Sequence, residues 1–174
     1  MEKRLRNIVL AAALSLAAIA PSTVRAQEAV VVSDNPEVLF TSPDPKLNAN
    51  KQVVYKIILE LLEAGHWDKA SQYIADDYVQ HNPNAQSGLK PVVQYFTEVL
   101  KVQPKPIPAE ISMKIADVVA EGDLVVVTYA RTEKDPKDPS KTYSTTWFDM
   151  WRIKDGKATE HWDPALLNEA PDLR

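Results

Sequence analysis

Four side chains that can transfer protons stand among aromatic residues in this sequence: His81, Asp149, His161 and Asp163. Because side chains alternate along a strand, His161 and Asp163 are expected to share one face of the last strand. Imidazole and carboxyl groups are poorly suited to burial, so strands that carry them beside tryptophans are unusual. We therefore expect these four side chains to meet in one pocket on the concave side of a sheet.

Such a pocket would suit general acid–base chemistry. A carboxyl group in an apolar cavity binds its proton more tightly, and a neighbouring acid adds to the effect. It could then remove or donate a proton next to a carbonyl group. Taken singly, the same residues also have structural interpretations, since Asp163 precedes Pro164 in a C-terminal turn and His161 could be half-exposed on its strand.

Aromatic residues are frequent around these groups. Trp147 and Asp149 are expected on the same strand face, and Tyr78 and Tyr129 lie in neighbouring segments. Most aromatic side chains of a domain belong to its core. We predict that Tyr78, Tyr129, Trp147 and His161 instead contact a flat, ring-containing or unsaturated ligand.

Several other classes of chemistry have weak support. The two histidines and two aspartates could in principle form a ligand set, but no pair of histidines stands one helical turn apart, so we expect no metal. The chain has no cysteine and only four glycines, and no glycine pattern that would cradle a phosphate. Its net charge of −4 and its lack of a basic stripe argue against a nucleic-acid partner.

The first residues have the pattern of an export signal. Lys3, Arg4 and Arg6 precede an apolar run over 8–20, and small or modest residues lead up to Ala26. The run is too short for a comfortable membrane span. We expect a signal peptide over 1–26, cleavage after Ala26, and a periplasmic or extracellular protein without a membrane partner after cleavage.

The remaining chain reads as one α+β domain. An extended, irregular arm over 27–48, punctuated by prolines, precedes the domain over 49–174. Helices come first and are followed by a run of strands joined by short turns, an order typical of helices packed on one face of an antiparallel sheet. The elements we expect are helices over 49–64, 67–74 and 89–101, a brief extended segment over 76–83, and strands over 109–120, 124–132, 142–153 and 157–163.

Two segments carry a family resemblance: Tyr73-Ile-Ala-Asp-Asp-Tyr-Val-Gln-His-Asn-Pro83 and Phe148-Asp-Met-Trp-Arg-Ile-Lys-Asp-Gly-Lys-Ala-Thr-Glu-His-Trp-Asp163. They resemble the SnoaL-like polyketide cyclases of the nuclear-transport-factor-2-like superfamily, over about 51–164. The resemblance implies a cone of helices wrapped by a strongly bent antiparallel sheet, with a deep pocket and often a dimeric state.

The resemblance also implies roles for individual residues. In the cyclases an aspartate on the last strand is the acid/base of an intramolecular aldol closure, without cofactor or metal, and its position falls on Asp163. Asp149 stands where those cyclases carry a histidine, and His81 matches the polar residue at the helix exit. The same superfamily includes hydrolases, isomerases, dehydratases and binding domains, so the fold does not fix the reaction.

Three functional hypotheses follow. The first is a cofactor-independent enzyme acting on a small, mostly apolar carbonyl compound, with Asp163, Asp149 and His81 as catalytic residues. The second is a non-catalytic periplasmic module that binds a small molecule in the same pocket. The third adds assembly as a homodimer through the outward sheet face, where Phe148 and Met150 are expected.

Overall fold

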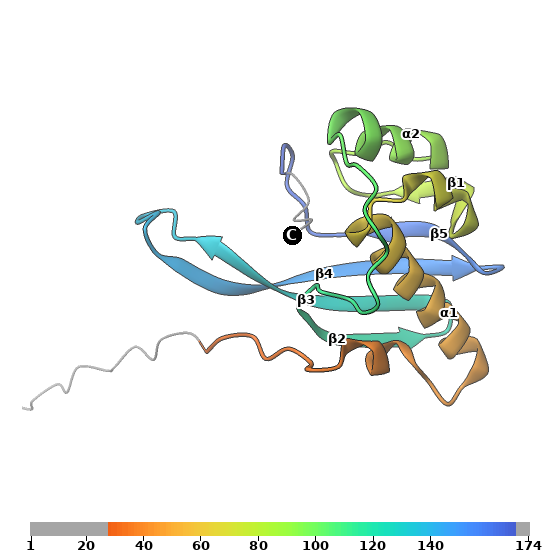
Figure 1. Cartoon of the computed structure of the whole chain (residues 1–174), viewed down its shortest axis with the longest axis horizontal. Coiled ribbons are helices and arrows are strands. Elements are labelled where there is room, and N and C mark those ends of the chain that lie inside the picture. Colours follow the sequence, from red (N-terminus) through yellow and green to blue (C-terminus); the bar gives the residue numbers. More distant parts are fainter. Residues whose placement is uncertain (1–27, 170–174) are drawn as a thin grey trace, which may run out of the picture.

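Five strands form a single sheet in the spatial order β1-β5-β4-β3-β2 in a computed structural model, which describes residues 28–169. The expected signal peptide lies outside the described residues. The strands are β1 (Ile74–Gln80), β2 (Ile115–Glu121), β3 (Leu124–Lys134), β4 (Thr142–Lys154) and β5 (Lys157–Trp162). The sheet twists and bends along the long β3–β4 pair, which reaches well beyond the helices (Figure 1). The expected α+β class with a curved sheet is confirmed.

Four of the strands are antiparallel neighbours, but β1 joins the edge of the sheet in parallel with β5. The brief extended segment expected over 76–83 is thus a true strand that begins at Ile74. The helix expected over 67–74 is shorter, a 3₁₀ helix, η3 (Trp67–Gln72). The parallel pairing places the end of β1 beside the end of β5, which proves decisive for the site.

The first long helix is α1 (Pro45–Lys56), which continues without a break into the wider π-helical turns of η2 (Ile57–Glu63). It starts four residues before the expected position because Asp44 caps it, accepting a hydrogen bond from the Leu47 N–H at 2.9 Å, and Pro45 fits the first helical turn. The helix ends, as predicted, at Gly65, whose φ is +74°.

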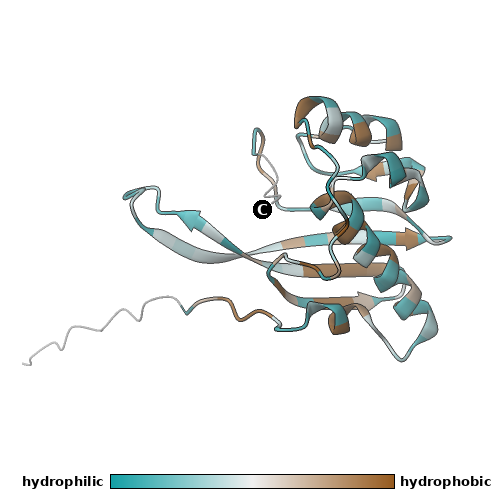
Figure 2. Cartoon of the chain, viewed as in Figure 1, coloured by the Kyte–Doolittle hydropathy of each residue, from teal (hydrophilic) through white to brown (hydrophobic). Residues whose placement is uncertain are grey.

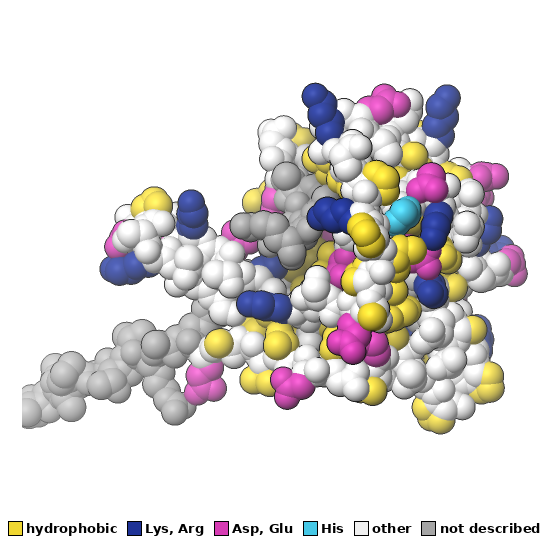
Figure 3. All heavy atoms as spheres, viewed as in Figure 1, with side chains coloured by type: hydrophobic (Ala, Val, Ile, Leu, Met, Phe, Trp, Pro, Cys, Tyr) yellow, Lys and Arg dark blue, Asp and Glu magenta, His cyan; other side chains and the backbone are white. Residues whose placement is uncertain are grey.

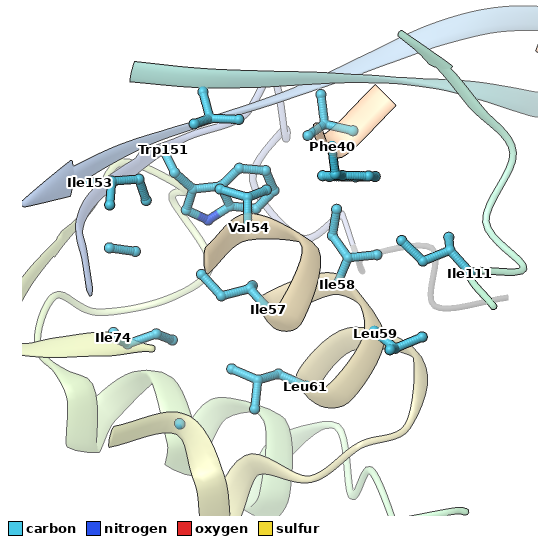
Figure 4. Packing of buried hydrophobic residues seen from close by; sticks show 14 of the residues in the cluster. Phe40, Val54, Ile57, Ile58, Leu59, Leu61, Ile74, Ile111, Trp151 and Ile153 are labelled. Atoms are coloured by element: carbon cyan, nitrogen blue, oxygen red, sulfur yellow. The ribbon is translucent and has the colours of Figure 1, made fainter. Parts of the chain in front are cut away.

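The apolar side of this helix fills the space against the sheet. Val54, Ile58 and Leu61 are fully buried, and Ile57 nearly so. Figure 4 shows them packed between Trp151 of β4 and the surrounding elements. In Figure 2 apolar residues are frequent in the helices and in the parts of the strands that lie beside them, whereas the far end of the β3–β4 pair is mostly hydrophilic. Helical spacing of apolar residues therefore predicted this core correctly.

A second helical segment, α2 (Leu89–Gln94) with η4 (Tyr95–Val99), covers the β1 end of the sheet. It agrees with the helix expected over 89–101. The strand expected over 109–120 begins only at Ile115. Before it, the Glu63 carboxylate accepts the backbone N–H groups of Ser112 and Met113, which replaces a strand partner for that stretch.

The arm before α1 docks on the domain and is not wholly irregular. It contains a 3₁₀ helix, η1 (Pro36–Phe40), and Phe40 is completely buried. The Lys51 ammonium group donates hydrogen bonds to the backbone carbonyls of Leu39 and Val118 at 2.8 and 2.9 Å, which ties the arm to β2. Burial lowers the pKa of Lys51, and nearby Asp117 offsets part of that shift.

The outward sheet face carries an apolar row that crosses four strands in register. On neighbouring strands, Val119 pairs with Val126, Val126 with Met150, and Met150 with Trp162. Phe148 lies beside the row and is half exposed.

The molecular face in Figure 3 shows basic and acidic side chains interspersed, without a continuous stripe of one sign. Within residues 28–169, no helix has the length and apolar character needed to span a bilayer.

Candidate active site

A cavity of about 860 Å³ lies between the concave face of the sheet and the helices. Strand alternation directs one side-chain set of each inner strand into it. Its aromatic lining residues come from several elements and are Trp67, Tyr78, Tyr95, Phe96, Tyr129, Trp147 and Trp151. A volume of this size is typical of sites for small organic ligands.

Asp149, His161 and Asp163 meet at the wall of this cavity. His161 lies between the two carboxylates: its Nε2 is 3.3 Å from Asp149 Oδ1, and its Nδ1 is 3.7 Å from Asp163 Oδ2. The three side chains are only 14, 10 and 6 % exposed, respectively. Trp151 stands directly opposite His161 in the β4–β5 register, with 4.9 Å between the ring centroids. The predicted convergence of these three residues is therefore observed.

Asp163 is held by two N–H donors. The Asn82 side-chain amide donates to Oδ2 at 2.8 Å, and the Ala165 backbone N–H donates to Oδ1 at 2.9 Å. The second bond is the C-terminal turn suggested by the sequence. Asp163 thus faces the cavity and also anchors the chain after β5, so its structural and chemical interpretations coexist.

Asp149 is oriented by its strand neighbour. The Trp147 indole N–H donates to Asp149 Oδ1 at 3.0 Å. The Arg131 guanidinium lies over the Trp147 ring, 4.2 Å from its centroid. The same guanidinium also contacts Glu133 and Glu169. This stack keeps the Trp147 ring in place and so fixes the direction of the Asp149 carboxylate.

Two buried tyrosines adjoin the acidic cluster. Burial raises the pKa of Tyr78 well above its ordinary value, and the negative charges of Asp149 and Asp163 raise it further. Burial also raises the pKa of Tyr129, with the Asp149 carboxylate adding to the shift. The Tyr129 hydroxyl is nevertheless not aligned for a hydrogen bond with any group among residues 28–169. Both side chains are therefore neutral phenols at neutral pH.

His81 does not belong to this cluster. Its Nε2 lies 2.9 Å from Glu160 Oε1, its ring stacks on Trp162, and its side chain is 43 % exposed. Arg152 also contacts Glu160, through Oε2 at 2.9 Å, and lies 5.5 Å from the Trp162 ring centroid. The expectation that His81 faces the pocket is therefore wrong. Tyr78 points inward, and alternation turns every second residue after it inward as well, so His81 faces outward.

The residues that take its place are Gln80 and Asn82. Gln80 Oε1 lies 2.9 Å from His161 Nδ1, and Asn82 binds Asp163. The pattern of Tyr78, Gln80 and Asn82 at every second position was visible in the sequence. The extended segment expected over 76–83 already implies this alternation, but the chemistry of the imidazole favoured His81 over its two amide neighbours.

Asp149, His161 and Asp163 are also close enough to be considered as metal ligands, since one ligand atom from each lies within 4.8 Å of the others. The two carboxylates lie nearest different ring nitrogens of His161. Asp149 approaches one ring nitrogen of His161, whereas Asp163 lies on the side of the other nitrogen, which Gln80 also contacts. A metal ion needs ligands aimed at one point, and this arrangement fits proton transfer better.

The sequence over 57–161 matches the SnoaL-like domain. This match spans more than half of the chain, and the chain therefore belongs to the SnoaL-like family. No curated protein sequence matches it.

Solved structures with similar folds include three of interest. A candidate polyketide cyclase from Acidithiobacillus ferrooxidans is 20% identical with a TM-score of 0.48, over 66% of this chain and 86% of its own. A cystatin-like protein of unknown function from Xanthomonas campestris is 21% identical with a TM-score of 0.47, over 66% and 88%. An LEH-like epoxide hydrolase of M. tuberculosis is 15% identical with a TM-score of 0.49, over 69% and 80%. At these levels of similarity, only the family match carries the assignment.

Proposed function

We propose that this protein is an acid–base enzyme of the SnoaL-like type that needs no cofactor and acts on a small, mostly apolar carbonyl compound. The observation that carries the proposal is the group of Asp149, His161 and Asp163 at the wall of an aromatic cavity. Titratable groups brought together in a cleft are the usual signature of acid–base catalysis. Aldol, isomerase and hydrolase reactions all share the proton transfers that such a group performs.

The roles follow from the contacts. Asp163, fixed by Asn82 and Ala165, removes a proton from the carbon next to the carbonyl group. The Asp149–His161 pair gives a proton to the enolate oxygen that forms and takes it back when the carbonyl is restored. Asp163 then returns its proton to carbon. In an aldol reaction the carbon instead attacks a second carbonyl group, and Asp163 gives its proton to the alkoxide oxygen that forms. Protons balance over the cycle.

The cavity lining sets the class of substrate. Trp67, Tyr95 and Trp151 offer flat apolar surfaces, which favour a ring-containing compound. Asp149 and Asp163 make the reacting end acidic, and the Arg131 guanidinium is already engaged by Glu133 and Glu169. A neutral ketone therefore suits the end of the cavity beside Asp149 and Asp163 better than a carboxylate.

Hydrogen–deuterium exchange of a simple ketone tests the proposal without knowledge of the natural substrate. The protein is incubated in D₂O with 1-tetralone, and deuterium at the carbon next to the carbonyl group is followed by NMR. We expect exchange above the buffer rate, and a loss of about 100-fold or more in Asp163→Asn and in Asp149→Asn. Circular dichroism melting curves verify that each variant is folded.

Two results would count against an enzyme. If the ketone binds, as detected by quenching of tryptophan fluorescence, but does not exchange, the protein is a binding module. If folded Asp163→Asn exchanges the ketone as fast as the natural protein, Asp163 is structural only.

Export is proposed from the sequence alone. A positive start followed by a short apolar run supports cleavage after Ala26. Mass spectrometry of the protein from the extracytoplasmic fraction should give a chain starting at Gln27; an intact Met1 in the cytoplasm would refute it.

A further inference from the structure

Gln80 makes two contacts with one oxygen atom. Its Oε1 accepts the backbone N–H of Asn82 at 3.1 Å and lies 2.9 Å from His161 Nδ1. The backbone N–H can only donate, so the atom facing it must be the amide oxygen and not the amide nitrogen. An amide oxygen carries no proton, and His161 Nδ1 must therefore be the donor in the second contact.

This contact is a product of the sheet topology. In the parallel β1–β5 pair, Gln80 stands in register with His161, and the His81 N–H donates to the His161 carbonyl at 3.1 Å. These backbone contacts hold the two side chains next to each other on the concave face. His81, between Gln80 and Asn82, is turned to the opposite face.

The other ring nitrogen of His161 is in an unusual position. Nε2 is sealed from solvent and has no aligned hydrogen-bond partner among the described residues, although Asp149 Oδ1 is 3.3 Å away. With the proton held on Nδ1, a neutral ring turns a lone pair toward a carboxylate oxygen. Buried polar atoms are normally satisfied, and a proton moving between these two atoms would satisfy both.

We infer that Gln80 is a positioning residue that keeps a proton on His161 Nδ1 and so reserves Nε2 for proton exchange with Asp149. Asp149 and Nε2 hold one exchangeable proton between them. When Asp149 gives a proton to the enolate oxygen, Nε2 supplies it and the ring is left neutral, with Nδ1–H still on Gln80. When the carbonyl is restored, the proton returns through Asp149 to Nε2. The catalytic part of this inference rests on the proposed function, whereas the placement of the proton does not.

Nitrogen NMR of the three histidines tests it directly. In ¹⁵N-labelled protein, the His161 signals are identified by their absence in His161→Gln. We expect Nδ1 of His161 to be protonated in the natural protein. Gln80→Met, of similar length but without an acceptor, should release that proton and shift the ring toward the Nε2–H form. Gln80→Glu again offers an acceptor to both N–H groups and should restore Nδ1–H.

Ketone exchange gives the second readout. In Gln80→Met the maximal rate of deuterium uptake should fall about 10–100-fold with little change in ketone affinity, and Gln80→Glu should recover most of it. Gln80→Met that keeps Nδ1 protonated, or natural protein protonated at Nε2 alone, would overturn the inference. If the proton on Nδ1 depends on Gln80 but the protein does not exchange ketones, only the proposed function is contradicted.

Discussion

Trp147 contributes to the site through one N–H group and one ring face. Its indole N–H binds Asp149 Oδ1, and its ring supports Arg131. Trp147→Phe keeps most of the ring but deletes the donor, so Asp149 loses a hydrogen bond to a charged acceptor, a contact worth about 1.5–3 kcal/mol. We expect ketone exchange to fall at least about 10-fold, while the melting temperature falls by only a few degrees.

Trp162→Phe is the matched control, because Trp162 lies on the outward face of the adjacent strand beside His81. It should leave exchange unchanged. Equal losses in both variants would mean that general destabilisation, and not the orientation of Asp149, explains the effect.

Glu60 provides a pH dependence that is separate from catalysis. Burial raises the pKa of this carboxyl, but hydrogen bonds from Lys69, Tyr73 and Lys56 outweigh burial, and the pKa is lowered from 4.5. A lowered folded-state pKa means stability that is present above the unfolded-state pKa and is lost as the pH falls through the folded-state value. Glu60→Gln should remove about 1–3 kcal/mol at pH 7 and flatten the acid side of the stability curve.

Urea unfolding at pH 7 and at several values below pH 4.5 measures this. An unchanged loss of stability on acidification in Glu60→Gln would show that other carboxyl groups govern it.

At the scale of elements, Gly65 separates η2 from the chain that follows. Its φ is +74°, and an added Cβ would lie 2.7 Å from the Gln103 carbonyl oxygen. Gly122, in the β2–β3 turn, has a similar φ of +62° but open space around it. Gly65→Ala therefore combines backbone strain with a clash, whereas Gly122→Ala meets strain alone.

We expect Gly122→Ala to cost about 1 kcal/mol of unfolding free energy and Gly65→Ala about 2–4 kcal/mol. Thermal or urea unfolding of the two variants measures the difference. Equal costs would indicate that the chain around Gln103 moves aside without penalty.

Element types were predictable because they depend on local patterns. The spacing of Val54, Ile58 and Leu61 identified the core face of the first helix, and the glycine turns separated the strands. Two boundaries were wrong where side chains intervene: Asp44 starts α1 early, and Glu63 delays β2. Both effects depend on hydrogen bonds that periodicity does not record.

The site was predictable only in part for the same reason. Asp149 and His161 lie on two adjacent antiparallel strands and Asp163 directly follows the second, so alternation was enough to bring them together. Gln80 depends on the parallel β1–β5 pair, a contact between distant segments that no local pattern specifies. His81 was favoured by its chemistry, although its neighbours determine which way it points.

At the scale of the whole molecule, the outward apolar row suggests how two copies would meet. Val119, Val126, Met150 and Trp162 cross the face that the described helices leave uncovered, and Phe148 adds a half-exposed ring. A second copy related by twofold symmetry would bury its apolar row against the apolar row of the first copy. We expect sedimentation to show a dimer at micromolar concentration.

Phe148→Lys should shift that protein to the monomer, while Val31→Lys, a change at an exposed valine in the arm, should leave the dimer intact. A monomer in the natural protein would remove this proposal without affecting the cavity.

The edge position of β1 has a consequence for the lifetime of the active state. The hydrogen bonds between Gln80 and His161 and between Asn82 and Asp163 each join residues 81 positions apart, and one partner of each lies in or shortly after an edge strand. Edge strands open more readily than central ones, so brief detachment of β1 would disassemble the proposed proton relay while most of the hydrophobic core stays folded. A molecule bound in the cavity should therefore protect the amides of β1 from hydrogen exchange more than those of β3.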